Sequence, residues 1–422
     1  MILPSIDLRG GHAVQLESGK RLVLDAGDPM PWLQRFARVG EVAVVDLDAA
    51  LGSGDNRELI AKMCRLAPCR VGGGIRDAAT ARRILDQGAT KVVLGTMAQP
   101  ELLQQLPRER CVAALDAVDG EVVVDGWRTA TGRGIAERMR ELAPYVDGFL
   151  VTFVEREGQL VGLDMERVRA LREAAGDREL VFAGGVATAA EVADLDRIGV
   201  QAQVGMALYT ERFTVADALI AQLPDLAPGQ LWPTVVTDEM GRALGLCWSS
   251  PESLRLALEQ GRGIYQSRRR GIWRKGETSG CTQELVRVDT DCDGDTLRFV
   301  VRQAGAGFCH LQTTTCWGPS TGLPALAERI KRQARGSDAD SYTRKLLADP
   351  QWLRSKLCEE AGELSDAVQR DDVVQEAADV LYFASVALAR AGASLDEVSA
   401  ELDRRALRVQ RRPGLAKTED EQ

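Results

Sequence analysis

Val71-Gly72-Gly73-Gly74-Ile75-Arg76-Asp77 decides the fold, because a variant of it returns as Ala183-Gly184-Gly185-Val186. Asp7 precedes the first glycine pair by 66 residues (73 − 7), and Asp116 precedes the second by 68 (184 − 116). Gly95-Thr96 and Gly205-Met206 follow their respective pairs by 22 (95 − 73) and 21 (205 − 184) residues. Such self-similarity indicates one structural unit that occurs twice in tandem.

The region around these repeats alternates short β-branched runs with longer segments of helical periodicity, which predicts a parallel sheet. The expected strands include 42–45, 92–94, 112–115, 148–151, 180–182 and 202–204. The expected helices between them include 79–87, 165–174 and 189–197. Repeated βα units over ~220 residues are most simply an eight-unit barrel.

Both halves of the repeat carry groups that suit a phosphorylated ligand. Glycines at the C-terminal ends of strands, where helices open, present N–H groups to an anion. We expect a ligand with a phosphate at each end that reacts between Asp7 and Asp116, which can serve as base and acid. Either carboxylate alone could be a salt-bridged strand-end residue, an interpretation that their matched positions weaken.

Residues 1–225 resemble a known family. The motifs are Ile-Asp-Leu-Arg-Gly-Gly (6–11), Val-Asp-Leu-Asp (45–48), the stretch 71–77, Leu-Asp-Ala (115–117) with Asp-Gly-Trp (125–127), and Gly-Met-Ala-Leu-Tyr (205–209). Together they resemble the ProFAR isomerase of histidine biosynthesis, which performs an Amadori rearrangement on a bis-phosphorylated ribonucleotide. The resemblance implies Asp7 as general base, Asp116 as general acid, Trp127 stacked on the substrate and Thr152 lining the site. It also implies phosphate binding at Gly73, Gly74, Gly95, Thr96, Gly184, Gly185, Gly205 and Met206.

One segment departs from that family. It usually has Asp-Gly-Thr after the strand that contains Thr152, where this chain has Glu157-Gly158-Gln159. The longer carboxylate and the lost hydroxyl could misplace a catalytic loop. A barrel that only binds phosphate, or serves as a scaffold, therefore stays open as an alternative.

A second motif, Asp291-Cys292-Asp293-Gly294-Asp295, alternates carboxylates with a thiol and a glycine. In an extended strand, the three carboxylates would lie on one face and Cys292 on the other. Oxygen ligands suit Mg²⁺ and a thiolate suits Zn²⁺. Cys309 and Cys316 follow, and three thiolates with an open fourth position describe a catalytic zinc site. The alternative is an acidic turn beside ordinary buried cysteines.

Residues 267–280, just upstream, are dense in the cations, hydroxyls and glycines that bind phosphate. With the acidic motif and the Cys309–Cys316 pair, residues 230–320 resemble phosphoribosyl-AMP cyclohydrolase. The resemblance implies Mg²⁺ on Asp291, Asp293 and Asp295, and Zn²⁺ on Cys292, Cys309 and Cys316, with the zinc site shared between two chains of a homodimer. It implies substrate contacts at Arg268, Trp273, Lys275, Glu277, Thr278, Ser279 and His310. The family usually has His where this chain has Cys281, so the role of that position is open.

From about residue 325, helical periodicity dominates. The expected helices are 325–335, 350–369 and 373–390, the last with Asp371-Asp372 as its N-cap, and a fourth opened by the capping box Ser394-x-x-Glu397. Proline- and glycine-containing linkers at 223–230 and 318–324 mark the domain boundaries. These features predict a small C-terminal helical bundle.

The bundle carries acidic residues at helical spacing: Glu359, Glu360, Glu363, Glu376 and Asp379. Two antiparallel helices could bring them around Mg²⁺; a solvated acidic face, or a bundle that only dimerises, is the alternative. With Ser341-Tyr342-Thr343 and Lys356-x-x-Glu-Glu-x-x-Glu, residues from 323 onward resemble phosphoribosyl-ATP pyrophosphohydrolase. The resemblance implies Mg²⁺ on the five acidic residues and a phosphate contact from Lys356. The family's usual His near Tyr382-Phe383 is absent.

The whole chain fits a multidomain cytoplasmic enzyme. Its 422 residues are 45% hydrophobic and 27% charged, with no apolar run long enough to span a membrane. A net charge of −9 argues against nucleic-acid binding, and nine scattered cysteines favour a reducing compartment. We expect an N-terminal (β/α)8 TIM barrel (1–225), a central small α+β metal-binding domain (230–320) and a C-terminal all-α helical bundle (323–422). By resemblance, the three catalyse consecutive steps of histidine biosynthesis.

Overall fold

The chain divides into two compact units in a computed structural model that describes residues 1–17, 21–124, 127, 129–154, 162–336 and 340–409. The first unit comprises Met1–Thr237, Leu246–Ala304 and the stretch from Arg404 onward. The second comprises Asp238–Gly245 and Gly305–Asp403. The three domain ranges expected from the sequence stay predictions.

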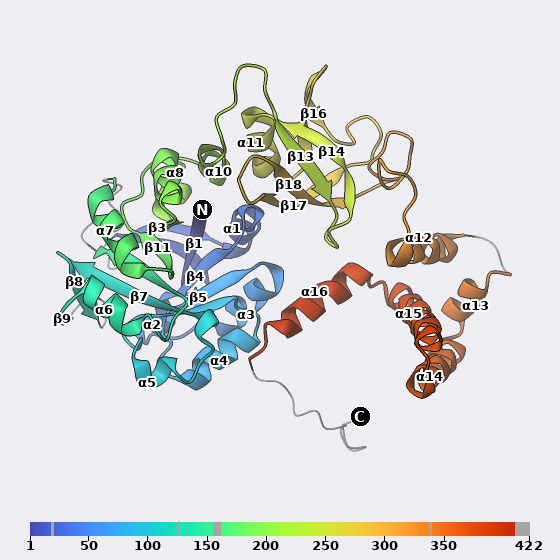
Figure 1. The fold of residues 1–422 in the computed structure, drawn as a ribbon, viewed down its shortest axis with the longest axis horizontal. Helices are drawn as coiled ribbons and strands as arrows, with labels where there is room; N and C mark the ends of the chain where they lie inside the picture. The colour runs from blue at the N-terminus through green and yellow to red at the C-terminus, as the bar shows by residue number, and fades with distance from the viewer. Residues whose placement is uncertain (18–20, 125–126, 128, 155–161, 337–339, 410–422) are drawn as a thin grey trace. The chain divides into compact units, whose positions relative to one another are not determined.

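The first unit contains a closed barrel of eight parallel strands (Figure 1). In order around the ring they are β1 (Ile2–Arg9), β4 (Val42–Asp46), β5 (Cys69–Gly72), β6 (Lys91–Leu94), β7 (Cys111–Val118), β10 (Gly148–Phe153), β11 (Glu179–Ala183) and β12 (Gln201–Val204). Pairing of β12 with β1 and of β10 with β7 closes the ring. The predicted TIM barrel is confirmed, and each of the six predicted strands lies within an observed one.

Helices follow the barrel strands along the chain and surround them (Figure 1). They are α1 (Pro29–Phe36), α2 (Leu47–Leu51), α3 (Arg57–Leu66), α4 (Ala78–Asp86), α5 (Pro100–Leu103), α6 (Ile135–Leu142), α7 (Met165–Ala175), α8 (Ala189–Arg197), α9 (Met206–Tyr209) and α10 (Val215–Gln222). The three predicted helices correspond to α4, α7 and α8. In α4, Ala78, Ala81 and Leu85 are buried at i, i+3 and i+7, so one stripe of the helix faces the sheet.

Two hairpins break the simple βα alternation. β2 (His12–Glu17) and β3 (Arg21–Gly27) follow β1, while β8 (Glu121–Val124) and β9 (Thr129–Gly134) follow β7. Each hairpin pairs antiparallel with the strand that precedes it. The insertions therefore occupy the same place in each half, as a tandem repeat predicts. Below the mouth, Leu3, Ala43, Val112, Leu150, Val181 and Ala183 pack into one buried cluster.

The central region is built from a four-stranded sheet and a hairpin. The sheet has the order β14 (Ala243–Ser249), β13 (Trp232–Thr237), β18 (Leu297–Gln303) and β17 (Gln283–Thr290). β15 (Ile264–Ser267) and β16 (Gly271–Arg274) form the hairpin, and α11 (Pro251–Gln260) completes the region. Residues 291–296 form a loop with bends between β17 and β18. The expected extended strand at 291–295 is therefore wrong, because Gly294 (φ 78°) turns the chain there.

The second unit holds the C-terminal helices α12 (Gly322–Arg335), α13 (Tyr342–Ala348), α14 (Pro350–Asp366) and α15 (Arg370–Ala391), and most of α16 (Leu395–Ala406). Ile330, Leu346, Leu353, Phe383 and Val386 form their core. Gln369, rather than Asp371-Asp372, is the N-cap of α15, and α14 ends three residues before the predicted limit. The capping box at Ser394 and Glu397 is confirmed, since each donates a hydrogen bond to the other's side chain.

The length and composition of the helices indicate whether any of them could span a membrane. No single helix in the described part of the chain is long and apolar enough to cross a membrane. Only α15 and α16 together reach that length and composition, with a bend of 104° between them.

Candidate functional site

Two carboxylates lie on opposite sides of the barrel mouth. Asp7 lies near the C-terminal end of β1, and Asp116 near that of β7. β1 and β7 are four strands apart in a ring of eight, so each half of the repeat contributes one of these groups. Both side chains are half-buried. A substrate that fills the mouth would therefore lie between them.

The environments of the two carboxylates differ. Burial raises the pKa of Asp7 to about 7, so this group changes charge near neutral pH. Burial also raises the pKa of Asp116, but hydrogen bonds from Trp127 and Thr152 act in the opposite direction. Thr152 lies directly across from Asp116 on β10, and Trp127 holds a left-handed backbone conformation (φ 68°). Asp116 thus has fixed partners, as a positioned acid requires.

The glycine pairs adopt backbone conformations that other residues rarely reach. Gly73, Gly74, Gly184 and Gly185 all have positive φ, between 68° and 97°. A Cβ on Gly73 would lie 2.3 Å from the carbonyl oxygen of Asp46. The same loop geometry therefore appears in both halves and depends on glycine.

The helices that follow these loops are already capped by the chain itself. The side chain of Asp77 accepts a hydrogen bond from Thr80 N at the start of α4. Thr188 and Glu191 form a capping box at the start of α8. Each cap occupies one backbone N–H of its helix's first turn, and phosphate binding at the loop glycines and helix N-termini stays a prediction.

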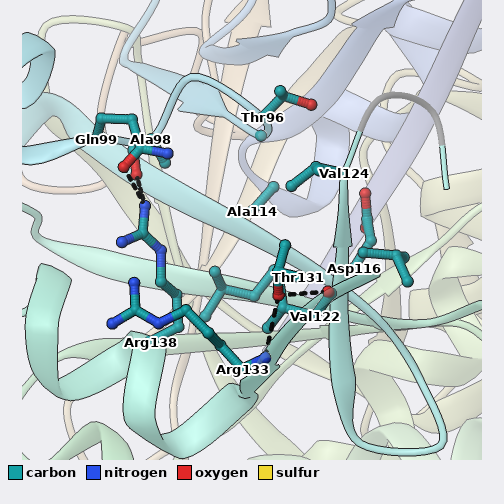
Figure 2. A pocket seen from close by; sticks show the side chains of 13 residues that line it. Thr96, Ala98, Gln99, Ala114, Asp116, Val122, Val124, Thr131, Arg133 and Arg138 are labelled. Carbon is teal, nitrogen blue, oxygen red and sulfur yellow. Dashed lines mark hydrogen bonds between the residues drawn. The ribbon is translucent and has the colours of Figure 1, made fainter. Parts of the chain in front are cut away.

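A cavity of about 140 Å³ lies between Asp116 and the Gly95-Thr96 loop (Figure 2). Arg133 of β9 and Arg138 of α6 also line it. Figure 2 shows the Arg138 guanidinium reaching Ala98 and Gln99, to whose oxygens it donates hydrogen bonds of 2.5 and 2.8 Å. Neither arginine was expected at the site from the sequence, because scattered cations near a hairpin give no signal of a role.

The other predicted phosphate residues lie at the end of β12. A Cβ on Gly205 would lie 2.7 Å from the Ser5 hydroxyl and 2.7 Å from the Gln15 side-chain oxygen, so this position also requires glycine. Met206 is buried and begins α9. Glu157 and Gln159, the departures from the family motif, lie outside the described residues.

The central acidic motif converges despite its loop conformation. Carboxylate oxygens of Asp291, Asp293 and Asp295 all lie within 4.8 Å of one another, and the three residues are exposed. Thr296 donates from its amide to Asp291 (3.1 Å) and from its hydroxyl to Asp295 (2.9 Å). Hydrogen bonding from Thr296 holds the pKa of Asp291 below its usual value. Three ionised oxygens at this spacing suit a hard divalent cation.

Two of the three predicted zinc ligands interact. Hydrogen bonds from the Leu311 amide, the Thr313 side chain and Cys316 lower the pKa of the Cys309 thiol. The imidazole Nδ1 of His310 lies 3.9 Å from the Cys309 sulfur. Cys292 is exposed and belongs to the first unit, whereas Cys309 and Cys316 belong to the second. A zinc site made from all three thiolates stays a prediction.

The predicted phosphate segment forms the β15–β16 hairpin and the turn after it. The Arg268 guanidinium lies 5.2 Å from the centre of the Trp248 ring, and the Trp273 ring packs on Tyr265 at 5.7 Å. Lys275 is buried and donates a hydrogen bond to the carbonyl oxygen of Cys281 (3.4 Å). Glu277, Thr278 and Ser279 in the turn face solvent, as do residues 268–270 and Trp273 of the hairpin. Lys275 thus holds the turn, while its exposed neighbours can meet a ligand.

The C-terminal carboxylates form a second acidic cluster. Oxygens of Glu360 and Glu363 on α14 and Glu376 on α15 lie within 4.8 Å of one another. Burial, and then the charges of Glu363, Asp379 and Glu360, raise the pKa of Glu376. Such mutual repulsion is relieved by a bound cation. In α14, the Lys356 amine contacts Glu359 at 2.9 Å and Glu360 at 3.1 Å.

Comparison with known sequences agrees with these three regions. The family profile described as "Histidine biosynthesis protein" matches residues 1–214. Those of phosphoribosyl-AMP cyclohydrolase and phosphoribosyl-ATP pyrophosphohydrolase match residues 245–318 and 323–406.

Individual relatives match the first half of the chain. A histidine biosynthesis trifunctional protein of Komagataella pastoris is 44% identical over 207 residues, which are 49% of this chain and 25% of that protein. A histidine biosynthesis bifunctional protein of Schizosaccharomyces pombe is 43% identical over 207 residues, 49% of this chain and 50% of that protein. The chain thus spans a quarter to a half of the length of these two relatives.

A third relative is matched along nearly its whole length. The 1-(5-phosphoribosyl)-5-((5-phosphoribosylamino)methylideneamino) imidazole-4-carboxamide isomerase of Thermus thermophilus is 36% identical over 231 residues, 52% of this chain and 98% of that protein. The first family profile covers half of the chain, and the barrel carries the expected repeat and facing carboxylates. The chain therefore belongs to the histidine biosynthesis protein family, with an isomerase-type barrel fused to cyclohydrolase-type and pyrophosphohydrolase-type regions.

Proposed function

We propose that this protein performs three consecutive steps of histidine biosynthesis. The C-terminal region releases pyrophosphate from phosphoribosyl-ATP, the central region opens the adenine ring of phosphoribosyl-AMP, and the barrel isomerises the product. The observation that carries the proposal is the pair Asp7 and Asp116, placed on opposite sides of the mouth by the two halves of a repeat. The three profile matches along one chain support the presence of all three activities in this protein.

In the barrel, the two carboxylates divide the proton transfers of an Amadori rearrangement. Asp116, held by Trp127 and Thr152, gives a proton to the sugar ring oxygen as its bond to carbon 1 breaks. Asp7 then takes the proton from carbon 2, and the resulting enol becomes the ketone. A base with a pKa of about 7 suits this step at neutral pH.

The C-terminal acidic cluster fits Mg²⁺. Its donors are carboxylate oxygens within 4.8 Å of one another, and their repulsion favours a divalent cation. We assign the metal to Glu360, Glu363 and Glu376, with Glu359 and Asp379 beside them. A Mg²⁺ ion held there would supply Lewis-acid chemistry for the release of pyrophosphate. Lys356, which now contacts two glutamates, is the side chain that would turn to a phosphate.

The central region has donors for both metals. Asp291, Asp293 and Asp295 offer a hard oxygen set for Mg²⁺, and Cys309 and Cys316 offer thiolates. We assign Zn²⁺ to Cys309, Cys316 and Cys292, the last from the same chain or from a partner in a homodimer. A zinc ion held there would supply Lewis-acid activation of water for attack on the purine ring. Thr278 and Ser279 would donate hydrogen bonds to the substrate phosphate, Glu277 would contact another part of the substrate, and a cytoplasmic location belongs to the same proposal.

One experiment tests all three steps. Purified protein is given phosphoribosyl-ATP with Zn²⁺ and Mg²⁺, and the products are identified by mass. We expect conversion through to the isomerised ribonucleotide. A stop after pyrophosphate release, or before isomerisation, would identify the region that is not active.

Two variants separate this proposal from its alternatives. Asp7→Asn is expected to stop the sequence at the unisomerised product, whereas a barrel that is only a scaffold predicts wild-type output. Glu360→Ala is expected to abolish pyrophosphate release, whereas a bundle that only dimerises predicts no change.

A further inference from the structure

The Tyr209 hydroxyl is a buried donor without a hydrogen-bond partner. Tyr209 is 6% exposed, and its oxygen has no hydrogen-bond partner among the described residues. Its ring is held between aromatic neighbours, 4.4 Å from Trp32 and 5.6 Å from Phe36. A buried hydroxyl left unpaired destabilises the folded protein, so its presence calls for a role.

The charge of the expected catalytic base, Asp7, acts on this hydroxyl. Tyr209 ends α9, which begins directly after β12 at Gly205, and Gly205 lies against Ser5 of β1. Asp7 is two residues beyond Ser5 on the same strand. The charge of Asp7, after burial, raises the pKa of Tyr209, so this hydroxyl stays protonated wherever Asp7 is ionised.

Other charged groups around this site are engaged elsewhere. They are Arg35, 5.9 Å from the Trp32 ring centre; His12, 3.0 Å from Asp25; Asp46, bonded to Asn56; and Arg9, whose charge acts on Asp48. Only burial acts on the pKa of Asp7, with no contribution from a hydrogen bond. A donor without an acceptor therefore lies near an acceptor without a donor.

We propose that Tyr209 is a positioning residue for Asp7, whose ionised carboxylate it holds by a hydrogen bond once substrate fills the barrel mouth. The proposal rests on the isomerase function given above. The Tyr209 ring is fixed by its neighbours, so the half-exposed Asp7 side chain is the group that turns. The bond stabilises the charged base and aims it at carbon 2 of the sugar.

Substitution Tyr209→Phe tests this role while keeping the aromatic packing. The acid limb of the pH profile of kcat reports the pKa of the base in the enzyme–substrate complex. The acid limb of the kcat/KM profile reports the pKa of the base in the free enzyme. We expect the acid limb of the kcat profile to move up by about one to two pH units, because a hydrogen bond to a charged group stabilises it by the corresponding free energy. The acid limb of the kcat/KM profile should not move. Unchanged limbs, or an effect on KM alone, would overturn the proposal.

Two further variants separate the role from a folding defect. Tyr265→Phe is the matched control, since it also removes a buried hydroxyl, which hydrogen-bonds Gln283 at 2.6 Å in the central region. It should leave both isomerase limbs in place. Fluorotyrosine at position 209 keeps the shape and strengthens the donor, so the kcat limb should move down. A fluorotyrosine enzyme with the wild-type limb would contradict the proposal.

Failure of this inference is distinguishable from failure of the proposed function. If the wild-type barrel shows no isomerase turnover, the function fails. The Asp7 carboxyl is then titrated by ¹³C NMR in wild type and Tyr209→Phe, with inorganic phosphate as the mouth ligand. A higher pKa in the variant supports the hydrogen bond, and equal values overturn it.

Discussion

Replacing the expected base should stabilise the barrel while abolishing isomerisation. Burial raises the pKa of Asp7 from 3.8 to about 7, or 3.2 units (7 − 3.8). At 1.36 kcal/mol per unit, keeping this carboxylate ionised in the folded protein costs up to about 4 kcal/mol. The figure is an upper limit, because the side chain is only half-buried. Asp7→Asn removes this cost.

The sign of the effect depends on pH. Between about pH 4 and pH 7, the folded protein keeps a proton on Asp7 that the unfolded chain has released. The free energy of unfolding therefore falls as pH rises through this window, and the loss is complete above it. The Asn variant lacks this loss, so its advantage over wild type should grow from pH 4 to pH 8.

Pulse proteolysis in urea measures this difference in the full chain. Peptides from β1 are followed by mass, because a protein with several folded regions does not unfold in a single two-state transition. Asp194→Asn on α8 is the control, since that side chain is 48% exposed and pairs with nearby Arg197. An Asp7→Asn advantage that is equal at pH 5 and pH 8 would refute the reasoning.

Three further predictions concern the other charged groups and the loops. Glu363→Gln should lower Mg²⁺-dependent pyrophosphate release by about 100-fold, because it removes a proposed metal ligand. The same variant should raise the melting temperature in the presence of chelator, because it relieves charge repulsion on Glu376. Arg70→Met should destabilise the barrel by about 3–5 kcal/mol in urea unfolding, since it leaves Glu41 without its buried cation and Glu179 with Lys91 alone. Arg21→Met at an exposed pair should change the free energy of unfolding by less than about 1 kcal/mol. Gly73→Ala should abolish soluble expression because of its clash with Asp46, whereas Gly95→Ala, with nothing within 4 Å, should express and melt like wild type.

The barrel was predictable from sequence because its signals are local and repeated. Buried β-branched runs identify parallel strands, and the observed strands match the predicted ones within a few residues. The glycine pairs with positive φ appear at matching places in both halves. Asp7 and Asp116 follow from the same repeat, so their facing positions needed no knowledge of distant contacts.

The acidic motif of the central region shows where local reasoning fails. An alternating pattern separates carboxylates from a thiol only if the backbone is extended, and Gly294 bends it. The three aspartates still converge, because a turn also brings alternate side chains together. The three predicted ligands thus lie close together, although the extended backbone expected for them is wrong.

Residues whose role depends on contacts between segments far apart in the chain leave no recognisable pattern in the sequence. Tyr209 was part of a recognised motif, but its unpaired hydroxyl depends on how α9 packs on Trp32 and Phe36. Arg133 lines the cavity beside Asp116 only because the second hairpin folds back over β7. Neither position could be assigned a role before the fold was known.

The two ends of the barrel differ in how their charges are compensated, and this contrast identifies the functional end. At the N-terminal ends of the strands, Arg70 contacts Glu41 and Glu179, and Lys91 contacts Asp147 (2.6 Å) and Glu179 (2.5 Å). At the opposite end, burial shifts the pKa of Asp7 without a compensating cation.

Groups selected for stability alone would be paired at both ends, because an uncompensated buried charge lowers the free energy of unfolding. The unpaired carboxylate and the unpaired Tyr209 hydroxyl therefore indicate that the barrel mouth retains polar groups for a ligand. A barrel that served only as a scaffold would gain nothing from these destabilising unpaired groups. Their presence favours a catalytic role for this region.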